Sequence, residues 1–116
     1  IPSHFILDSV LSFAISDAYP VSPGHMLIIP RHHVGDYFDL TTDEVDDLMR
    51  LLHMAKDHLS HARSPDGYNI GINVGKAAGQ TVSHVHIHLI PRYDGDVENS
   101  RGGVRGVIPG KADYLK

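Results

Sequence analysis

The sequence predicts an α+β fold with an antiparallel sheet of about five strands and one long helix. One observation is a single capped, amphipathic helical pattern near the middle of the chain, over residues 42–62. Another is that short strand-like segments precede and follow this helix without a regular strand–helix–strand alternation, which favours antiparallel pairing. The third is a strict alternation of histidine and apolar residues over residues 84–89, a period of two that is typical of a strand with two different faces.

Length and charge indicate one domain and exclude some classes of partner. The chain has 116 residues and a formal net charge of -4, and we treat residues 1–116 as one domain with a C-terminal arm over 93–116. The negative charge argues against a nucleic acid polymer as a partner, although backbone amides can still hold a small anion. No apolar stretch approaches the roughly 18 residues of a membrane span, so no membrane partner is expected.

Cysteine usage bears on the compartment. The 116 residues contain no cysteine, which excludes disulfides and thiolate zinc sites within them and fits a cytoplasmic protein. The sequence begins with Ile1 rather than Met, so the natural N-terminus can lie upstream.

Five segments are predicted as strands. They are rich in apolar and β-branched residues and lie between turn-forming residues, and they span residues 4–8, 10–16, 25–30, 68–74 and 83–91. Pro23 and Gly24 suit the centre of a type II turn between the second and third strands, because proline fixes φ and glycine accepts a positive φ.

The helix is predicted from about Thr42 to about Ala62. Thr41 and Glu44 have the spacing of a capping box, in which each side chain accepts a hydrogen bond from the other residue's backbone. Apolar residues then recur at intervals of three and four, which predicts one stripe that faces the core: Val45, Leu48, Leu52, Ala55 and Leu59.

The alternating segment is expected to present one histidine face, made of His84, His86 and His88, and one apolar face. A zinc site is one interpretation, in which a His-x-His pair is joined by His25, His32 or a carboxylate. However, a rise of about 3.3 Å per residue separates the outer two Cα atoms by about 13 Å, too far for all three histidines to bind one ion on a straight strand. A solvated polar face is the second interpretation. The third is nucleophilic catalysis by the central imidazole at a phosphoryl-type centre, next to a glycine-rich loop over residues 75–79 that can approach phosphate closely.

The segment from His84 to Ile90 resembles the signature of the histidine triad (HIT) family, His-φ-His-φ-His-φ-φ with φ apolar. The flanking stretches INVGKAAGQTV and IPRY support the resemblance, and DAYPVSPGHMLIIPRHH resembles the second strand, turn and third strand of the family. The tail RGGVRGVIP is similar to that of bacterial and archaeal members. The resemblance covers most of the chain, roughly residues 13–93.

The resemblance implies a role for each matched residue. His86 matches the nucleophile that forms a covalent nucleotidyl-histidine, with its other ring nitrogen bonded to a backbone carbonyl of the triad strand. His84 and His88 match the members that orient it and assist proton movement, and His25 matches a fourth histidine beside them. The remaining matched positions contact the nucleotide: Asp17 at the ribose, Asn73, Gly79, Gln80 and Thr81 at the α-phosphate and leaving group, and Ile28 or its strand neighbours at the base. By its residue type alone, Asp17 fits a turn cap better.

The resemblance also implies an activity and an assembly. HIT proteins act at a nucleotide α-phosphorus, so we expect hydrolysis of an adenine-linked dinucleoside polyphosphate or nucleoside phosphoramidate by a homodimer that joins two sheets. The alternatives are a phosphorylase or nucleotidyltransferase of the same family and a non-catalytic nucleotide-binding regulator. His88 favours hydrolysis, because the transferase branch typically has glutamine at that position.

No cofactor is expected for the covalent step, although magnesium can accompany a polyphosphate substrate. Some members hold a structural zinc with an N-terminal Cys-x-x-Cys, which is not expected here because the sequence lacks cysteine. Basic residues near the C-terminus are either contacts for distal phosphates or solvated surface charge: Arg92 and Arg105 first, then Arg101 and Lys111. The leaving group is expected to be selected by the arm and by the partner subunit.

Overall fold

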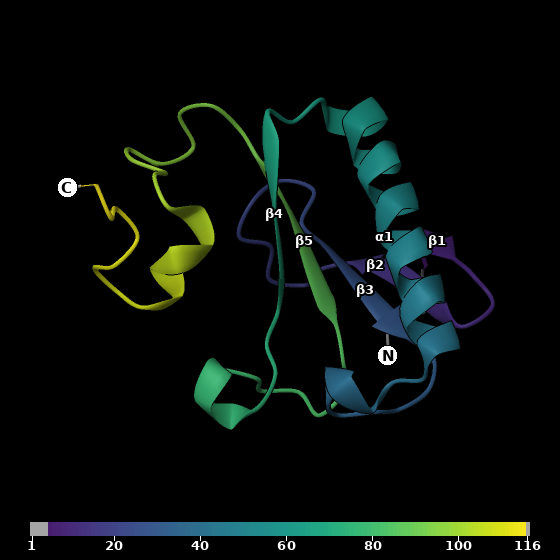
Figure 1. Cartoon of the computed structure of the whole chain (residues 1–116). Helices are drawn as coiled ribbons and strands as arrows, with labels where there is room; N and C mark the ends of the chain where they lie inside the picture. The colour runs from purple at the N-terminus through teal and green to yellow at the C-terminus, as the bar shows by residue number, and fades with distance from the viewer. Residues whose placement is uncertain (1–4, 116) are drawn as a thin grey trace.

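The computed structural model describes residues 5–115, so His4 of the first predicted strand lies outside the described residues. Five strands and one α-helix follow in the order β1 (Leu7–Asp8), β2 (Ser12–Ser16), β3 (Met26–Pro30), α1 (Thr42–Arg63), β4 (Gly67–Ile72) and β5 (Ile87–Arg92) (Figure 1). Three short 3₁₀ helices are η1 (Tyr37–Asp39), η2 (Lys76–Ala78) and η3 (Gly103–Val107). The strands form one antiparallel sheet in the order β1-β2-β3-β5-β4, which confirms the α+β prediction.

Helix α1 begins where the capping signal places it. The Thr41 side chain accepts a hydrogen bond from the Glu44 amide at 3.1 Å, and the Glu44 carboxylate accepts one from the Thr41 amide at 2.9 Å. These two bonds satisfy donors that a helix start leaves without partners. The helix ends at Arg63, one residue beyond the prediction, and Ser64 closes it in the left-handed region with φ 50°.

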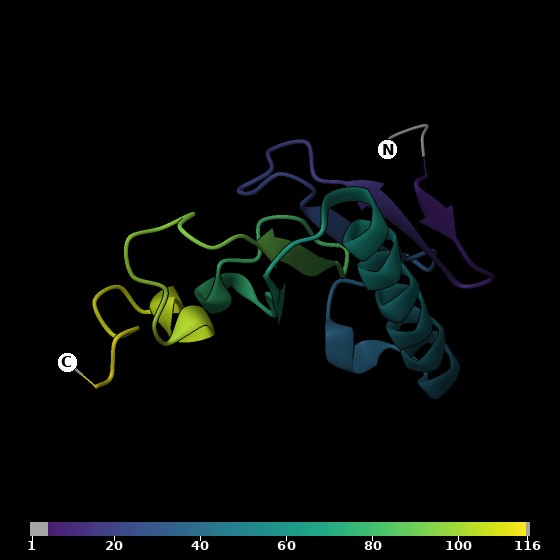
Figure 2. The ribbon, with the colours of Figure 1, turned by 90° about the horizontal axis from the view of Figure 1, so that it is seen from above.

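The core lies between α1 and one face of the sheet (Figure 2). The predicted stripe of α1 is largely buried there, with Leu51 in addition, although Val45 is only partly buried. The buried apolar residues shared by the two layers are Ala14, Met26, Ile28, Leu48, Leu51, Leu52, Ala55, Leu59, Ile87 and Leu89. Since the helix covers only this face, the opposite face of the sheet is left for other contacts.

The turn between β1 and β2 is fixed by a buried carboxylate. Asp47 of α1 accepts hydrogen bonds from the hydroxyls of Ser9 and Ser12, at 2.5 Å and 2.6 Å, and from the Leu11 amide at 3.2 Å. The predicted strand over residues 10–16 is therefore shorter at its start, because its first residues belong to this turn.

The last strand also begins later than predicted. The prediction was 83–91, but ladder pairing starts at Ile87, so His84 and His86 lie on an extended segment before β5. The pairing with β3 ends at Ile28 with Ile87 although β3 continues to Pro30, because the Val85 amide donates to the Val34 carbonyl at 2.8 Å instead of joining the ladder. The alternation of buried and partly exposed residues nevertheless continues through residues 84–92.

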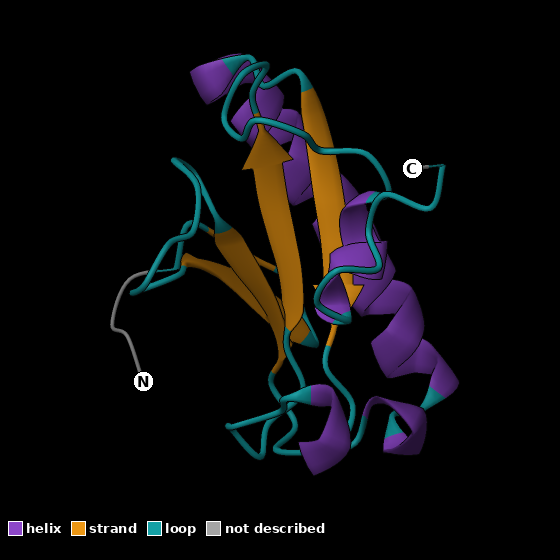
Figure 3. Ribbon diagram, turned by 90° about the vertical axis from the view of Figure 1, so that its left-hand side faces the viewer, coloured by secondary structure: helices purple, strands orange, loops and turns teal. Residues whose placement is uncertain are grey.

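The C-terminal arm folds into an ordered loop beside β4 (Figures 1 and 3). Asp113 holds the loop together, because its carboxylate accepts a hydrogen bond from Asn99 at 2.9 Å and lies 3.6 Å from the Arg101 guanidinium. Helix η3 packs against β4. A Cβ on Gly103 would lie 3.3 Å from Nδ2 of the Asn69 side chain. Among residues 5–115, no helix is long and apolar enough to cross a membrane.

Candidate active site

The candidate site lies on the face of the sheet opposite α1. The strand register places Ile15, Leu27, His88 and Gly71 in one row across four strands. Asn73 directly follows β4 and His86 directly precedes β5, so these two residues lie opposite each other beyond the last ladder pair, Ile72 with Ile87.

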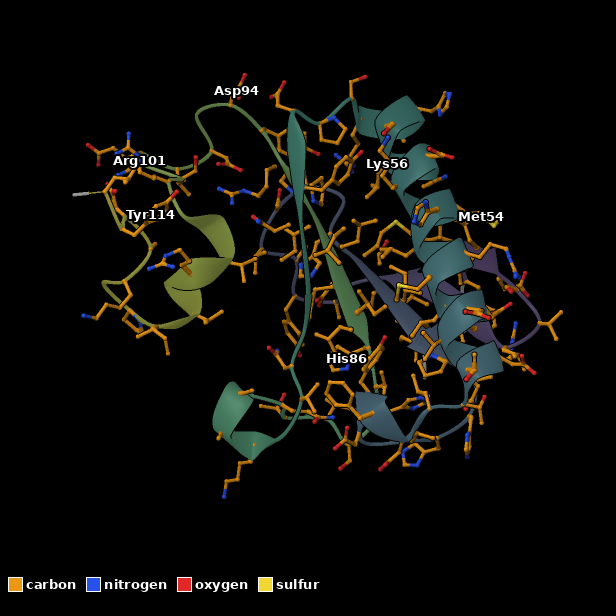
Figure 4. All side chains as sticks on the ribbon, in the orientation of Figure 1. Met54, Lys56, His86, Asp94, Arg101 and Tyr114 are labelled. Atoms are coloured by element: carbon orange, nitrogen blue, oxygen red, sulfur yellow. The ribbon has the colours of Figure 1, made fainter. Side chains whose placement is uncertain are left out.

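The His86 ring is held in one tautomer. Its Nδ1 lies 2.8 Å from the His84 carbonyl oxygen, and only a protonated nitrogen can make this hydrogen bond. The Nε2 atom therefore carries the free lone pair. This carbonyl is the acceptor that the resemblance leads us to expect in the triad segment. Figure 4 shows His86 at the start of β5, far from Asp94 at the other end of that strand.

His84 links the triad segment to β3. Its Nε2 lies 2.8 Å from the Pro30 carbonyl oxygen, so this nitrogen donates a hydrogen bond. The His33 ring meets the His84 ring edge to face at a centroid distance of 4.8 Å. His84 thus fixes the extended segment whose carbonyl orients His86.

His25 and His88 form the deepest pair of the site. The Val21 amide donates to His25 Nδ1 at 3.2 Å, so the proton of a neutral His25 is on Nε2. That Nε2 lies 3.0 Å from His88 Nδ1, which must then accept, and His88 keeps its own proton on Nε2. A chain of hydrogen bonds from one backbone amide therefore sets both tautomers.

Asp17 caps a turn and also lies beside the histidine pair. Its Oδ1 accepts a hydrogen bond from the Tyr19 amide at 2.8 Å, which is the turn cap. Its Oδ2 lies 3.3 Å from His25 Nε2 and 4.0 Å from His88 Nδ1, so the carboxylate also borders the histidine pair. Contact of Asp17 with a ribose stays a prediction.

Burial lowers the pKa of both His25 and His88 below the ordinary value of 6.5. For His88, the neighbouring His86 and His25 lower the pKa further, and for both rings the Asp17 carboxylate opposes the shift. Both rings are therefore predominantly neutral at pH 7, as the hydrogen-bond chain requires.

Among residues 5–115, the same three side chains form a group that could bind a metal. One ligand atom each from Asp17, His25 and His88 lie within 4.8 Å of one another. However, the Val21 amide directs the proton of His25 onto Nε2, the atom that would have to bind the ion. The bonding therefore favours a hydrogen-bonded cluster. His32, considered above as a metal ligand, hydrogen bonds Glu44 at 3.0 Å instead.

The glycine-rich loop is closed by Gln80. Its Oε1 accepts from the Gly75 amide at 2.8 Å, and its Nε2 donates to the carbonyls of Gly35 at 2.7 Å and Val82 at 3.0 Å. The amides of Gly79 and Gln80 donate to the carbonyls of Lys76 and Gly75, at 3.0 Å and 3.1 Å.

We expected the amides of this loop to be free to bind phosphate. Instead, the Gly79 and Gln80 amides donate to carbonyls of the turn itself. Among residues 5–115, neither the amide nor the hydroxyl of Thr81 donates a hydrogen bond. Thr81 is thus the better phosphate candidate in the loop, and the phosphate roles of Gly79, Gln80 and Asn73 stay predictions.

Two other expectations change with the structure. Ile28 is fully buried beneath α1 and cannot flank a base, whereas its neighbours Leu27 and Ile29 are partly exposed. Arg92 binds Asp96 through two hydrogen bonds of 2.7 Å and 2.8 Å and donates to Asn69 at 2.7 Å. The hydrogen bonds from Arg92, together with one from the Tyr93 amide, lower the pKa of Asp96 to about 2.

Arg105 lies over the Tyr114 ring, with its guanidinium carbon 4.8 Å from the ring centroid. Both arginines proposed for distal phosphates thus have partners within the protein, and their phosphate role stays a prediction. Lys111 and Arg101 lie in the same arm, where Arg101 pairs with Asp113.

Sequence reasoning missed the backbone groups that orient the site. The amide of Val21 and the carbonyls of Pro30 and Gly35 bind His25, His84 and Gln80 respectively. No side-chain pattern marks such groups, because any residue supplies them and only the folded register brings them into place.

Comparison with known proteins agrees with this geometry. Residues 1–95 match the HIT domain, which is well over half of the chain. The chain belongs to the HIT family.

Among curated relatives of this HIT protein, a bis(5'-adenosyl)-triphosphatase of Dictyostelium discoideum is 41% identical over 102 residues, which cover 84% of this chain and 66% of the relative. An AP-4-A phosphorylase of Mycobacterium tuberculosis is 36% identical over 87 residues, 74% of this chain and 45% of the relative. An adenosine 5'-monophosphoramidase of Saccharomyces cerevisiae is 40% identical over 94 residues, 81% of this chain and 57% of the relative. The chain thus spans between about half and two thirds of the length of these relatives.

Among solved structures, a histidine triad nucleotide-binding protein from Sulfolobus tokodaii has a TM-score of 0.77 and 33% sequence identity. The match covers 83% of this chain and 64% of that structure. It supports the fold described above.

Proposed function

We propose that this HIT protein hydrolyses the bond between the α-phosphorus of a nucleotide and its leaving group, with His86 as the nucleophile. The observation that carries the proposal is the hydrogen bond from His86 Nδ1 to the His84 carbonyl, which leaves the Nε2 lone pair for attack. The triphosphatase and monophosphoramidase relatives support an adenine-linked substrate with a phosphoric anhydride or phosphoramidate bond.

In the first step, a bond forms between His86 Nε2 and phosphorus, and the bond from phosphorus to the leaving oxygen or nitrogen breaks. The leaving atom takes the bonding electron pair and receives the Nε2 proton of His88 in its protonated, imidazolium form, which leaves His88 neutral; this transfer contributes about 10²–10⁴-fold to the rate. Asn73 and Thr81 stabilise the charge that develops on the phosphoryl oxygens.

In the second step, a water oxygen bonds to phosphorus and the bond to His86 Nε2 breaks, returning the electron pair to the ring. The water proton passes to His88 Nε2, so both histidines recover their starting states. The products are a nucleoside monophosphate and the protonated leaving group. No resident metal or structural zinc is part of the proposal, and magnesium enters only as a counter-ion of a polyphosphate substrate.

The test is to trap the covalent intermediate. Mixed with an adenosine phosphoramidate and quenched within one turnover, the wild-type chain should carry one adenylyl group on His86 by peptide mass spectrometry. His86→Ala should still bind the substrate but lose at least about 10³-fold in turnover, because the nucleophile is gone. His53→Ala, on the exposed side of α1, is the matched control. An adduct on another residue, or turnover retained by His86→Ala, excludes this assignment.

A phosphorylase is the second candidate, favoured by the mycobacterial relative of that name. Phosphate would then replace water in the second step and yield a nucleoside diphosphate. Incubation of diadenosine tetraphosphate with and without inorganic phosphate separates the two. ADP formed from the adenylyl group only when phosphate is present would identify a phosphorylase.

We also propose a homodimer and a cytoplasmic location. Strand β4 is at an edge of the sheet, the position from which a sheet can be extended, and Ile70 on it is 50% exposed. A second copy adding its β4 would extend the sheet. A monomer mass by light scattering would contradict the homodimer. The cytoplasmic location is tested separately, by imaging of a tagged chain in cells.

A further inference from the structure

The turn that carries His25 lies against the end of β5, in a place where the sheet has no strand. Strand β3 begins at Met26, and its ladder with β5 stops at the pair of Met26 and Leu89. Beyond this pair, β5 continues to Arg92 with no residue of β3 opposite it. The turn over residues 17–25 takes that place, because two of its residues are hydrogen bonded to this end of β5 and to the residue that follows it.

Two hydroxyl groups hold the turn there. The buried Ser22 hydroxyl donates to the Pro91 carbonyl at 2.6 Å. In the opposite direction, the Tyr93 hydroxyl donates to the Pro23 carbonyl at 2.7 Å. The turn is therefore fixed to β5 by side chains, whereas a strand in the same place would be fixed by its backbone groups.

The same turn orients His25 and, through it, His88. The Ser22 carbonyl accepts a hydrogen bond from the His25 amide at 3.1 Å, and the Val21 amide donates to His25 Nδ1 at 3.2 Å. Both the backbone and the ring of His25 are thus bonded to the segment that the Ser22 hydroxyl anchors. Since His25 Nε2 lies 3.0 Å from His88 Nδ1, the position of the turn also fixes the His88 ring, with Nε2 as the nitrogen outside this pair.

We propose that Ser22 and Tyr93 are positioning residues, which hold the turn so that His25 orients His88 for proton transfer from its Nε2. The inference rests on the proposed function. Each hydroxyl uses its hydrogen on a backbone carbonyl, and neither side chain lines the cavity of about 510 Å³ beside His25 and His88. They act through His25 rather than by contact with the reacting atoms, so their loss should slow proton transfer and leave substrate binding unchanged.

The experiment compares two substrates whose leaving groups differ in their need for a proton. The leaving nitrogen of adenosine 5'-monophosphate n-butylamide must be protonated, whereas the p-nitrophenyl ester releases a stable anion. In the double variant Ser22→Ala, Tyr93→Phe, release of the amine in the first turnover should slow at least about tenfold. Release of p-nitrophenol, and the concentration of either substrate that gives half of the maximal rate, should change less than about twofold.

Two further variants accompany the double variant. Tyr93→Phe alone removes the bond made by the partly exposed side chain, so it gives the same test if the double variant fails to fold, with amine release slowed at least about threefold. Tyr19→Phe is the matched control, because it removes a hydroxyl from the same turn. The Tyr19 side chain is 88% exposed and its hydroxyl makes no hydrogen bond among residues 5–115, so both rates should stay unchanged.

Amide hydrogen exchange, followed by NMR without substrate, checks that the turn itself is loosened. The Val21 amide is protected by its bond to His25, so its exchange should be at least about tenfold faster in the double variant. Amides within the ladder of β4 and β5 should exchange at the wild-type rate, which separates a loosened turn from a destabilised fold.

The outcomes separate the two proposals. An equal loss for the amide and the ester, no loss for the amide, the same loss in Tyr19→Phe, or unchanged exchange of the Val21 amide overturns the positioning role alone. If the wild-type chain forms no adduct on His86 with either substrate, the proposed function fails, and the positioning role fails with it.

Discussion

At the scale of single residues, hydrogen-bond capacity decides which groups contact a ligand and which position others. Gln80 has two donor hydrogens and one carbonyl oxygen on its side chain, and contacts to Gly75, Gly35 and Val82 use all three groups. We therefore interpret Gln80 as a residue that positions the loop, with Thr81 presented by it.

Replacing Gln80 tests this role. Gln80→Glu keeps an acceptor for the Gly75 amide but cannot donate to the two carbonyls, and Gln80→Met removes all three bonds. Each change should lower kcat/KM for an adenosine phosphoramidate about 5–30-fold, the equivalent of about 1–2 kcal/mol. The midpoint of thermal unfolding should change little, because the loop is largely exposed. Full activity in Gln80→Met would show that the bonds do not matter.

At the scale of elements, one buried carboxylate joins the helix to the sheet. Asp47 is 5% exposed and accepts three hydrogen bonds from the turn between β1 and β2. Asp47→Ala should lower the free energy of unfolding by at least about 2 kcal/mol, because the buried Ser12 hydroxyl would lose its partner. Urea unfolding measures the change. The exposed neighbour Asp46 provides the control, and an equal loss in Asp46→Ala would contradict this explanation.

The bounds of an element could be predicted from the sequence where neighbouring residues determine them. They could not be predicted where hydrogen bonds to residues far away in the sequence determine them. The start of α1 at Thr41 follows from two residues three positions apart, so the sequence alone determines it. The start of β5 depends on Pro30 and Val34, which lie more than fifty positions away from the residues that they pair with. The triad could be found by its alternation. The cavity beside His25 and His88, by contrast, is lined by Val104 and Val107 only because the arm folds back on β4.

At the scale of the whole molecule, one face of the sheet stabilises the fold and the other face carries the candidate active site. One face packs against α1 and forms the core, and the other carries the histidines, Asp17 and the arm. Because His25 belongs to the site yet is 3% exposed, folding and the protonation of the site are coupled.

The free energy of unfolding should therefore fall as the pH drops below about 6.5. Burial lowers the pKa of His25 and His88 in the folded chain below the ordinary value of 6.5, so the unfolded chain takes up their protons first as pH falls. Each group then contributes a slope of at most about 1.4 kcal/mol per pH unit, with stability rising with pH. Glu44, Asp47 and Asp96 have lowered pKa values and add their own loss only in more acidic solution, below about 4.5.

Urea unfolding at a series of pH values between 8 and 5 measures this slope. His25→Gln should make this slope shallower, whatever its effect on stability at pH 8, because one of the two histidines that titrate is gone. His53→Gln, exposed on α1, should leave it unchanged. A slope as steep in His25→Gln as in the wild type would mean that His25 does not couple protonation to folding. It would also contradict the conclusion that the hydrogen bonds from Val21 to His25 and from His25 to His88 hold both rings neutral in the folded chain.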